Sequence, residues 1–224
     1  MKESDTISVL ICCHSVDHEH DMLLQEALES LTRQTYPNFE TVLVLDQCHE
    51  DTKWTAEPYK DVLNLKIHER PNKQGLAIAK NFGLAHCKGQ WIAYLDADDQ
   101  WMDCKLEWQR NFLLENPGVD FCFTEAWDRT GGVLLPNCFK VGQYETHAQI
   151  AGAIGRENVV CHGSAIIRKL AIDSLGGYRT DRSLLGREDW DLWKRAIDGG
   201  FTFHKIRERL YIYSMGTSVT RGEV

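Results

Sequence analysis

Three carboxylates stand within four residues, directly after a short apolar run. Residues 91–95 read as a buried strand, and Asp96, Asp98 and Asp99 follow it. Open α/β sheets bind their ligands at the carboxyl ends of the strands. Side chains two positions apart on extended backbone point the same way. Asp96 and Asp98 therefore face one pocket if strand geometry continues through them.

Two carboxylates held this close repel each other unless one binds a proton or both share a cation. Mg²⁺ and Mn²⁺ take oxygen ligands, often one or two carboxylates together with the phosphates of a substrate. The chemistry indicated is therefore a divalent metal beside a diphosphate. The competing interpretation is a solvated turn that only ends the strand, and the three acids by themselves do not separate the two.

The segments around the acids alternate between strand and helix patterns. The predicted strands are 7–12, 41–45, 62–68, 91–95 and 119–124, and apolar residues at helical spacing mark 24–31, 75–84 and 106–113. This alternation predicts an α/β fold, with a mostly parallel central sheet flanked by helices on both faces in the manner of Rossmann folds.

The second half of the chain is less regular. Glycine pairs at 131–132 and 176–177 read as turns, residues 161–168 as a strand, and a further helix ends at Gly199. No repeat, linker or low-complexity segment interrupts the chain. A single domain over 1–224 is the simplest interpretation.

Composition narrows the class of protein. The chain has 224 residues, 43% of them hydrophobic and 26% charged, which is ordinary for a globular protein. A net charge of −8 argues against a nucleic-acid partner, and an anionic substrate then needs a local cation. Eight cysteines without a CxxC pair argue against a zinc ribbon or a redox motif and suit a reducing compartment.

The same composition gives an expectation for location. The N-terminus lacks a basic flank and a cleavage site, so a signal peptide is not predicted. No run approaches the ~20 apolar residues that span a membrane. A cytoplasmic protein is expected, and peripheral contact with the inner face of the membrane stays open.

Six short motifs then stand in order along the chain. They are Cys12-Cys13-His14-Ser15, Gln34-Thr35-Tyr36, an acidic loop that starts at Asp46, Asn72-Lys73-Gln74-Gly75 with Lys80-Asn81, Asp96-Ala97-Asp98, and Glu188-Asp189. Each is weak alone. Together, over residues 7–212, they resemble the family 2 glycosyltransferases of the GT-A fold.

The resemblance implies a role for each matched residue. The nucleotide-binding residues would be Cys13 and His14 as pocket lining, Asp46 as hydrogen-bond acceptor for the base, Gly75 as a point of close backbone approach, Asn81, and Asp96 at the ribose or a metal-bound water. Asp98 would bind Mn²⁺ or Mg²⁺, Asp189 would be the general base, and Glu188 would position the acceptor or the helix start. Residues 1–120 would form the nucleotide-binding half and 121–224 the acceptor-side half.

The implied reaction moves one sugar from a nucleotide sugar to an acceptor hydroxyl. A metal at the diphosphate offsets the charge of the leaving group, and a carboxylate takes the acceptor proton. A single base opposite the leaving group implies inversion, and Asp46 as imide acceptor favours a UDP-sugar. The chain lacks the Gln-x-x-Arg-Trp signature of processive synthases and, in residues 211–216, a metal-binding His found in many relatives. Surface polysaccharide or glycoconjugate synthesis is the expected setting, with an unknown carbohydrate, lipid-linked or protein acceptor.

Two other classes compete with this reading. A haloacid-dehalogenase type phosphatase also has Asp-x-Asp after a strand, but near its N-terminus and followed by Thr or Val, whereas Asp99-Gln100-Trp101 follows here. A non-catalytic nucleotide-sugar-binding subunit would keep the fold without turnover. Retention of Asp98 and Asp189 argues against this second alternative.

Overall fold

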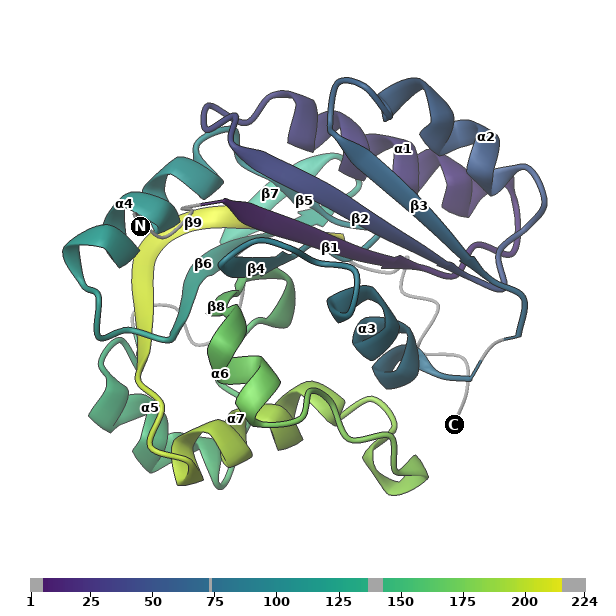
Figure 1. Cartoon of the computed structure of the whole chain (residues 1–224). Helices are drawn as coiled ribbons and strands as arrows, with labels where there is room; N and C mark the ends of the chain where they lie inside the picture. Colours follow the sequence, from purple (N-terminus) through teal and green to yellow (C-terminus); the bar gives the residue numbers. More distant parts are fainter. Residues whose placement is uncertain (1–5, 73, 137–142, 215–224) are drawn as a thin grey trace.

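One continuous mixed sheet forms the centre of the protein (Figure 1). The computed structural model describes residues 6–72, 74–136 and 143–214. Strand order across the sheet is β3-β2-β1-β4-β8-β6-β9-β5, and β7 pairs with β6 beside this path. The strands are β1 (Ile7–Cys13), β2 (Phe39–Asp46), β3 (Leu65–Arg70), β4 (Trp91–Tyr94), β5 (Gln100–Trp101), β6 (Phe121–Thr130), β7 (Val133–Pro136), β8 (Ile166–Arg168) and β9 (Phe203–Ser214).

The first four strands in space, β3, β2, β1 and β4, are parallel, as the alternating sequence pattern predicts. Their carboxyl ends therefore meet at one edge of the sheet, with Cys13 opposite Leu45 and Asp46 opposite Arg70. The start of the third predicted strand was wrong. Val62 is 69% exposed and Asn64 has φ 45°, so residues 62–64 form a turn and β3 begins only at Leu65.

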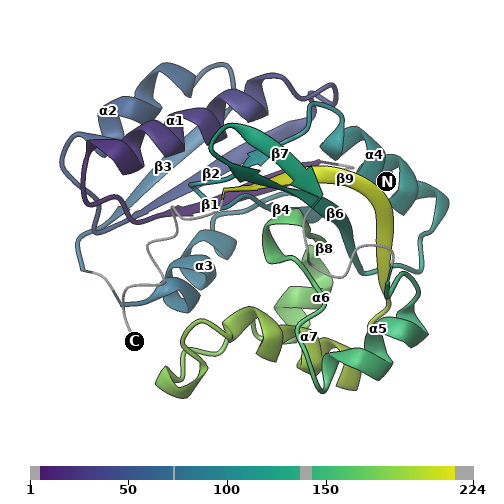
Figure 2. The same cartoon turned by 180° about the vertical axis from the view of Figure 1, so that it is seen from behind.

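Beyond β4 the sheet is mixed, which corrects the expectation of a mostly parallel sheet. β8 runs antiparallel to both β4 and β6, while β9 runs parallel to β6. The strand predicted at 161–168 is reduced to Ile166–Arg168 because His162–Ser164 forms a 3-10 turn. β9 is long and strongly curved (Figures 1 and 2), and its far end pairs with β5. The chain after β8 thus returns to the acids that follow β4.

Helices cover both faces of the sheet, as expected. They are α1 (His18–Thr32), α2 (Thr52–Ala56), α3 (Leu76–Leu84), α4 (Lys105–Glu115), α5 (His147–Ile154), α6 (Lys169–Ser174) and α7 (Glu188–Asp198). Side chains of α1, α2 and α4 belong to one apolar core, and those of α3, α5, α6 and α7 to a second core on the opposite face (Figure 1). In β1, Val9 and Ile11 face the first core and Leu10 faces the second, the period of two expected for a strand buried on both sides.

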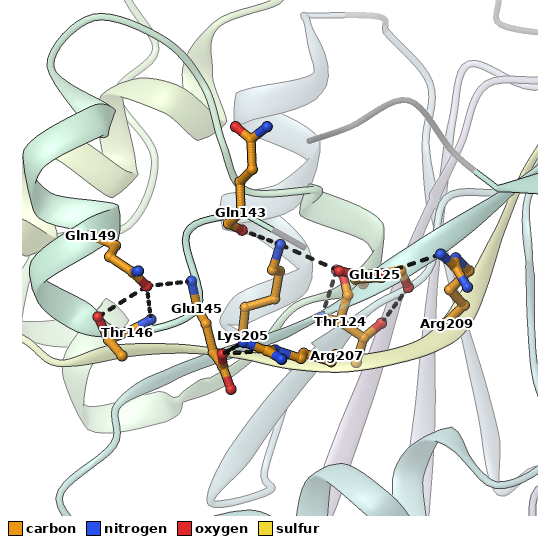
Figure 3. Close-up of polar contacts among 10 residues, drawn as sticks. Thr124, Glu125, Gln143, Glu145, Thr146, Gln149, Lys205, Arg207 and Arg209 are labelled. Atoms are coloured by element: carbon orange, nitrogen blue, oxygen red, sulfur yellow. Dashed lines mark hydrogen bonds and ion pairs between the residues drawn. The ribbon is translucent and has the colours of Figure 1, made fainter. Parts of the chain in front are cut away.

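The segment that leads into α5 is fixed to β9 by polar contacts (Figure 3). The backbone N–H of Lys205 donates to the carbonyl of Glu145 (2.9 Å), and the Lys205 ammonium donates to the carbonyl of Gln143. Nε of Arg207 donates to a carboxylate oxygen of Glu145 (2.8 Å), and Thr146 begins α5 with a capping box. These contacts tie α5 to the central sheet.

The described residues also bear on membrane-spanning helices and on the state of the cysteines. Among the described helices, none is long and apolar enough to cross a membrane. The cysteines of the described segments are all free thiols. Cys122 is buried, as expected for a small apolar residue in a core, whereas Cys12 is only partly buried and packs against the second core. Cys138 lies outside the described residues.

Candidate active site

The acids after β4 form a tight turn, residues 96–99, which we call the acid turn. β4 ends at Tyr94, and the backbone N–H of Asp99 donates to the carbonyl of Asp96 (3.1 Å). Strand geometry therefore does not continue through Asp96 and Asp98, and strand alternation is not what places them. The turn itself sets the direction of each carboxylate.

Tyr211 on β9 holds the acid turn. Its hydroxyl lies within hydrogen-bond distance of a carboxylate oxygen of Asp99 and of Asp96 Oδ2 (3.2 Å). The other oxygen of Asp99 accepts from the backbone N–H of Ser214 (2.7 Å), and Asp99 is 1% exposed. Asp99 is thus committed to joining the turn to β9. Asp96 and Asp98 are less buried than Asp99, and their contact with a ligand stays a prediction.

Gly163 makes room for the Tyr211 hydroxyl. A Cβ atom at position 163 would lie 2.0 Å from Tyr211 Oη and 2.3 Å from Tyr211 Cζ. Real Cβ atoms do not approach other atoms so closely, since interiors are packed to crystal-like density. The 3-10 turn that carries Gly163 therefore has to be free of a side chain at this point for Tyr211 to reach the acids.

The electrostatics of the acid turn suit a hard cation. Desolvation raises the pKa of Asp96; Lys80 lowers it in part, and the charge of Asp98 adds to the rise. Desolvation, then Asp98 and Asp96, raise the pKa of Asp99 well above its usual range. Mg²⁺ and Mn²⁺ prefer oxygen ligands such as carboxylates. A cation bound between two carboxylates would also offset their mutual repulsion. In the part of the chain that the structure describes, no three His, Cys, Asp or Glu side chains could hold a metal alone, so substrate oxygens would have to complete the set.

The first turn of α7 carries the two candidate catalytic acids. Asp189 accepts a hydrogen bond from the side chain of Asn158 through Oδ2 (2.9 Å) and one from the backbone N–H of Trp190 through Oδ1 (2.6 Å). Desolvation raises the pKa of Asp189, and Lys80 partly reverses that rise. A carboxylate with a raised pKa and fixed orientation has the properties of a general base.

Lys80 links the acid turn to α7. Its ammonium forms an ion pair with Glu188 (2.9 Å), and both side chains are buried. Desolvation would lower the pKa of Lys80, but the charges of Glu188, Asp96 and Asp189 raise it above its usual value. The fold therefore pairs Lys80 with Glu188, 108 positions later in the sequence, and places this ammonium within electrostatic range of Asp96 and Asp189.

His14 and Asp46 meet at the ends of β1 and β2. Nδ1 of His14 is 2.8 Å from the carbonyl oxygen of Asp46, and the Asp46 carboxylate accepts from Arg70 at the end of β3 (2.9 Å). Cys13 ends β1 opposite Leu45, and its thiol packs in the apolar core on the α1 face. If Cys13 contacts a nucleotide, we therefore expect its backbone to do so rather than its thiol. Lining of a nucleotide pocket by these residues stays a prediction.

Gly75 and Asn81 lie on α3. Gly75 is the N-cap, with φ 101°, a conformation that side chains rarely adopt, and a Cβ there would meet nothing within 4 Å. The position is therefore open for close approach of a ligand. Asn81 donates to the carbonyl of Tyr178 (2.7 Å) and accepts from its N–H (2.8 Å). Its amide fixes the loop before α7, so any contact of Asn81 with a nucleotide remains a prediction.

Sequence reasoning missed four residues of this site. Arg70 can be recognised only once β3 is in register with β2, which places it opposite Asp46. Tyr211 and Gly163 act through a contact between distant segments, and Asn158 follows a helix that the apolar pattern did not predict. Tyr211 stands in residues 211–216, where many relatives carry a metal-binding His, but nothing in its spacing links it to the acids.

The sheet, with parallel β3, β2, β1 and β4 and an acid turn after β4, has the fold of the GT-A glycosyltransferases. The chain belongs to glycosyl transferase family 2, whose family model matches residues 8–173.

Known proteins agree with this assignment. EpsE of Bacillus subtilis, named as a glycosyltransferase, is 29% identical over 220 residues, which are 94% of this chain and 73% of EpsE. The structure of S. aureus TarS 1-349 in complex with UDP superposes with a TM-score of 0.77 at 20% identity, over 94% of this chain and 60% of that one. The mannosyltransferase PcManGT from Pyrobaculum calidifontis, in complex with GDP-Man and Mn²⁺, gives 0.71 at 17% identity, over 98% and 59%. The chain thus spans about 60% of the solved structures, and likeness at this identity shows the fold alone.

Proposed function

We propose that the protein transfers one sugar, with inversion, from a nucleotide sugar to an acceptor hydroxyl in the synthesis of surface polysaccharide or glycoconjugate. A UDP-sugar is the preferred donor, and Mn²⁺ or Mg²⁺ assists its binding. The acceptor is a carbohydrate, lipid-linked or protein group. Residues 1–120 form the donor half of the single domain and 121–224 the acceptor half.

The observation that carries the proposal is the buried ion pair of Lys80 with Glu188, in which the Lys80 ammonium also lies within electrostatic range of Asp96 and Asp189. The acid turn suits a metal-bound diphosphate. Asp189, a desolvated carboxylate, suits a general base. Both halves of a transfer reaction thus have their side chains at one edge of the sheet. The structural neighbours carry different nucleotides, UDP in the TarS complex and GDP-Man with Mn²⁺ in the PcManGT complex, so the preference for uridine rests on Asp46 and the metal on the acid turn.

In this proposal the donor enters along the ends of β1, β2 and β4. Asp46 accepts a hydrogen bond from the ring N–H of uracil, and Asp98, with Asp96, faces the diphosphate. A bound divalent metal would supply positive charge to the leaving diphosphate. Asp189 takes the proton of the acceptor hydroxyl while the acceptor oxygen bonds to the anomeric carbon. The bond from that carbon to the diphosphate breaks, and the nucleoside diphosphate leaves.

Metal dependence can be measured without knowing the acceptor. We expect Mn²⁺ or Mg²⁺ to strengthen UDP binding by about tenfold or more, since the cation offsets the charges of both carboxylates and diphosphate. Asp98→Ala should abolish this difference. Isothermal titration of UDP with metal and with chelator gives the result.

Asp103→Ala is the matched control, because Asp103 is an exposed acid just beyond the acid turn, paired with Arg33 on the surface. It should leave the metal effect intact. Equal UDP affinity with Mn²⁺ and with chelator in the unmodified protein would contradict metal assistance.

Base preference depends on Asp46. We expect UDP to bind more tightly than ADP or CDP, because neutral adenine and cytosine offer no ring N–H to a carboxylate acceptor. Asp46→Asn should reduce this preference, since an amide can present either a donor or an acceptor. Competition binding among nucleoside diphosphates measures it. ADP binding as tightly as UDP would refute the role of Asp46.

Membership in family 2 argues against the phosphatase alternative. The non-catalytic subunit remains distinguishable by experiment. A protein that binds UDP-sugar in the presence of metal but neither transfers nor hydrolyses it, with any acceptor offered, would favour the subunit.

A further inference from the structure

We propose that Lys80 is a positioning residue for transfer: its ammonium, held by Glu188, ties α7 to α3 and keeps the Asp189 carboxylate ionised and oriented toward the acceptor. This inference rests on the proposed function, because it assigns Lys80 a part in the reaction for which Asp189 is the base. It adds a residue whose effect passes through Asp189 rather than through contact with either substrate.

The first argument is geometric. Lys80 lies on α3 in the donor half and Glu188 begins α7 in the acceptor half, and both helices cover the same face of the sheet (Figures 1 and 2). Their ion pair of 2.9 Å joins residues 108 positions apart in the sequence. Because Glu188 and Asp189 are neighbours in the first turn of α7, whatever fixes Glu188 also fixes the start of the helix that carries the base.

The second argument is the charge around Asp189. The charged or titratable groups that act on it are Lys80 from α3 and Glu188 from its own helix, while the Tyr178 hydroxyl from the preceding loop senses its charge. Asp96 of the acid turn acts on Lys80 from the other side. The ammonium thus pairs with one carboxylate, Glu188, and lies within electrostatic range of two others, Asp96 and Asp189. Without it, their mutual repulsion and desolvation would favour protonation of Asp189, and a protonated carboxyl cannot accept the acceptor's proton.

The third argument concerns stability. A buried ion pair contributes little to net stability, because desolvation of both charges offsets their attraction, and apolar replacements are often as stable. Burial of Lys80 (4% exposed) is therefore not explained by stability alone. Its position beside the candidate base provides a reason for the charge to be there.

A competing role is direct contact between Lys80 and the donor diphosphate. The described contacts point elsewhere: the ammonium is bonded to Glu188 and lies 5.2 Å from the centre of the Tyr178 ring. The two roles differ in what a variant changes. A diphosphate ligand affects donor affinity, whereas a positioning residue affects the base.

The test follows the ionisation of Asp189 directly. Carboxyl resonances of the full chain are titrated by NMR without donor, for the unmodified protein, Lys80→Met, Lys80→Arg and Glu188→Gln. Lys80→Met should make Asp189 titrate at higher pH, because a positive neighbour is lost. Glu188→Gln should move it to lower pH, because a negative neighbour is lost while Lys80 stays. Lys80→Arg should restore the original titration.

Kinetics provide the second readout. Lys80→Met should lower kcat by about tenfold to a hundredfold, the scale of a misplaced catalytic group, and move the acid limb of its pH profile upward. UDP affinity should change little, and Lys80→Arg should recover most of kcat. If Lys80→Met fails to fold, Glu188→Gln, which keeps a hydrogen-bond acceptor for Lys80, still tests the sign of the shift.

Each outcome has one meaning. An unchanged titration of Asp189 in folded Lys80→Met or Glu188→Gln overturns the inference, as does loss of UDP affinity with kcat preserved. If Asp189 titrates as expected while Asp189→Asn transfers sugar normally, the proposed base is wrong and the inference falls with it. If no sugar is transferred by any variant but the titrations shift as expected, the proposed function fails while the electrostatic role of Lys80 stands.

Discussion

Asp189→Asn should lower the rate of sugar transfer by about 10²-fold or more, the usual scale for loss of a general base. The amide keeps the shape of the carboxylate and can still accept hydrogen bonds from Asn158 or from the N–H of Trp190. It cannot take up the proton of the acceptor. Fold and UDP affinity should therefore stay near those of the unmodified protein.

The expected effect on stability distinguishes this from an unfolding defect. Desolvation raises the pKa of Asp189 in the folded chain above its unfolded value. An acid shifted this way favours the folded state when protonated, and that contribution is lost as pH rises through the folded pKa. At neutral pH the charge thus opposes folding, so a neutral Asn should leave Tm unchanged or slightly higher.

The measurement is kcat beside Tm, once an acceptor is found. Asp198→Asn makes the same change at the exposed end of the same helix and should be fully active. Near-normal kcat in a stable Asp189→Asn protein would end the assignment. The other acids in the first turn, Glu188 and Asp191, would then be tested in turn.

Gly163→Ala should disturb the acid turn indirectly, through Tyr211. The added methyl would lie 2.0 Å from Tyr211 Oη, so either Tyr211 or the 3-10 turn must move. Overpacking of this kind destabilises by about 1–3 kcal/mol. Displacement of Tyr211 also frees Asp99 and Asp96 from the hydroxyl that holds the acid turn. We therefore expect the metal-dependent part of UDP binding to be lost together with some stability.

Gly152→Ala is the control for the chemical change. Gly152 lies within α5, and a Cβ there would meet nothing within 4 Å. Because Ala is preferred over Gly inside a helix by about 0.5–1 kcal/mol, this variant should be slightly more stable and bind UDP normally. Thermal melts and UDP titrations of both variants decide the matter. An unchanged metal effect in Gly163→Ala would show that Tyr211 does not hold the acids in the way the distances suggest.

The sequence by itself determined most of the first half of the fold. Apolar runs of strand length, separated by helical spacing, predicted β1, β2, β4, α1, α3 and α4 because each is buried by a regular local pattern. The motifs also predicted where the acids stand: Asp46 at the end of β2, the acid turn after β4, and Asp189 in the first turn of α7. Local periodicity and motif order are properties of adjacent residues, so they can be read before folding.

Tertiary structure decided what each acid does. In the sequence Asp99 was one of three adjacent acids without an assigned role, and the return of β9 buries it against Tyr211 and Ser214. In the sequence, Lys80 was only one member of a motif. The fold brings Glu188 of α7 into an ion pair with it. Contacts between segments 40 to 115 residues apart depend on register, strand curvature and side-chain packing, none of which leaves a periodic trace in the sequence. The mixed half of the sheet was unpredictable for the same reason, since short strands such as β8 and β5 are defined by the neighbours that pair with them.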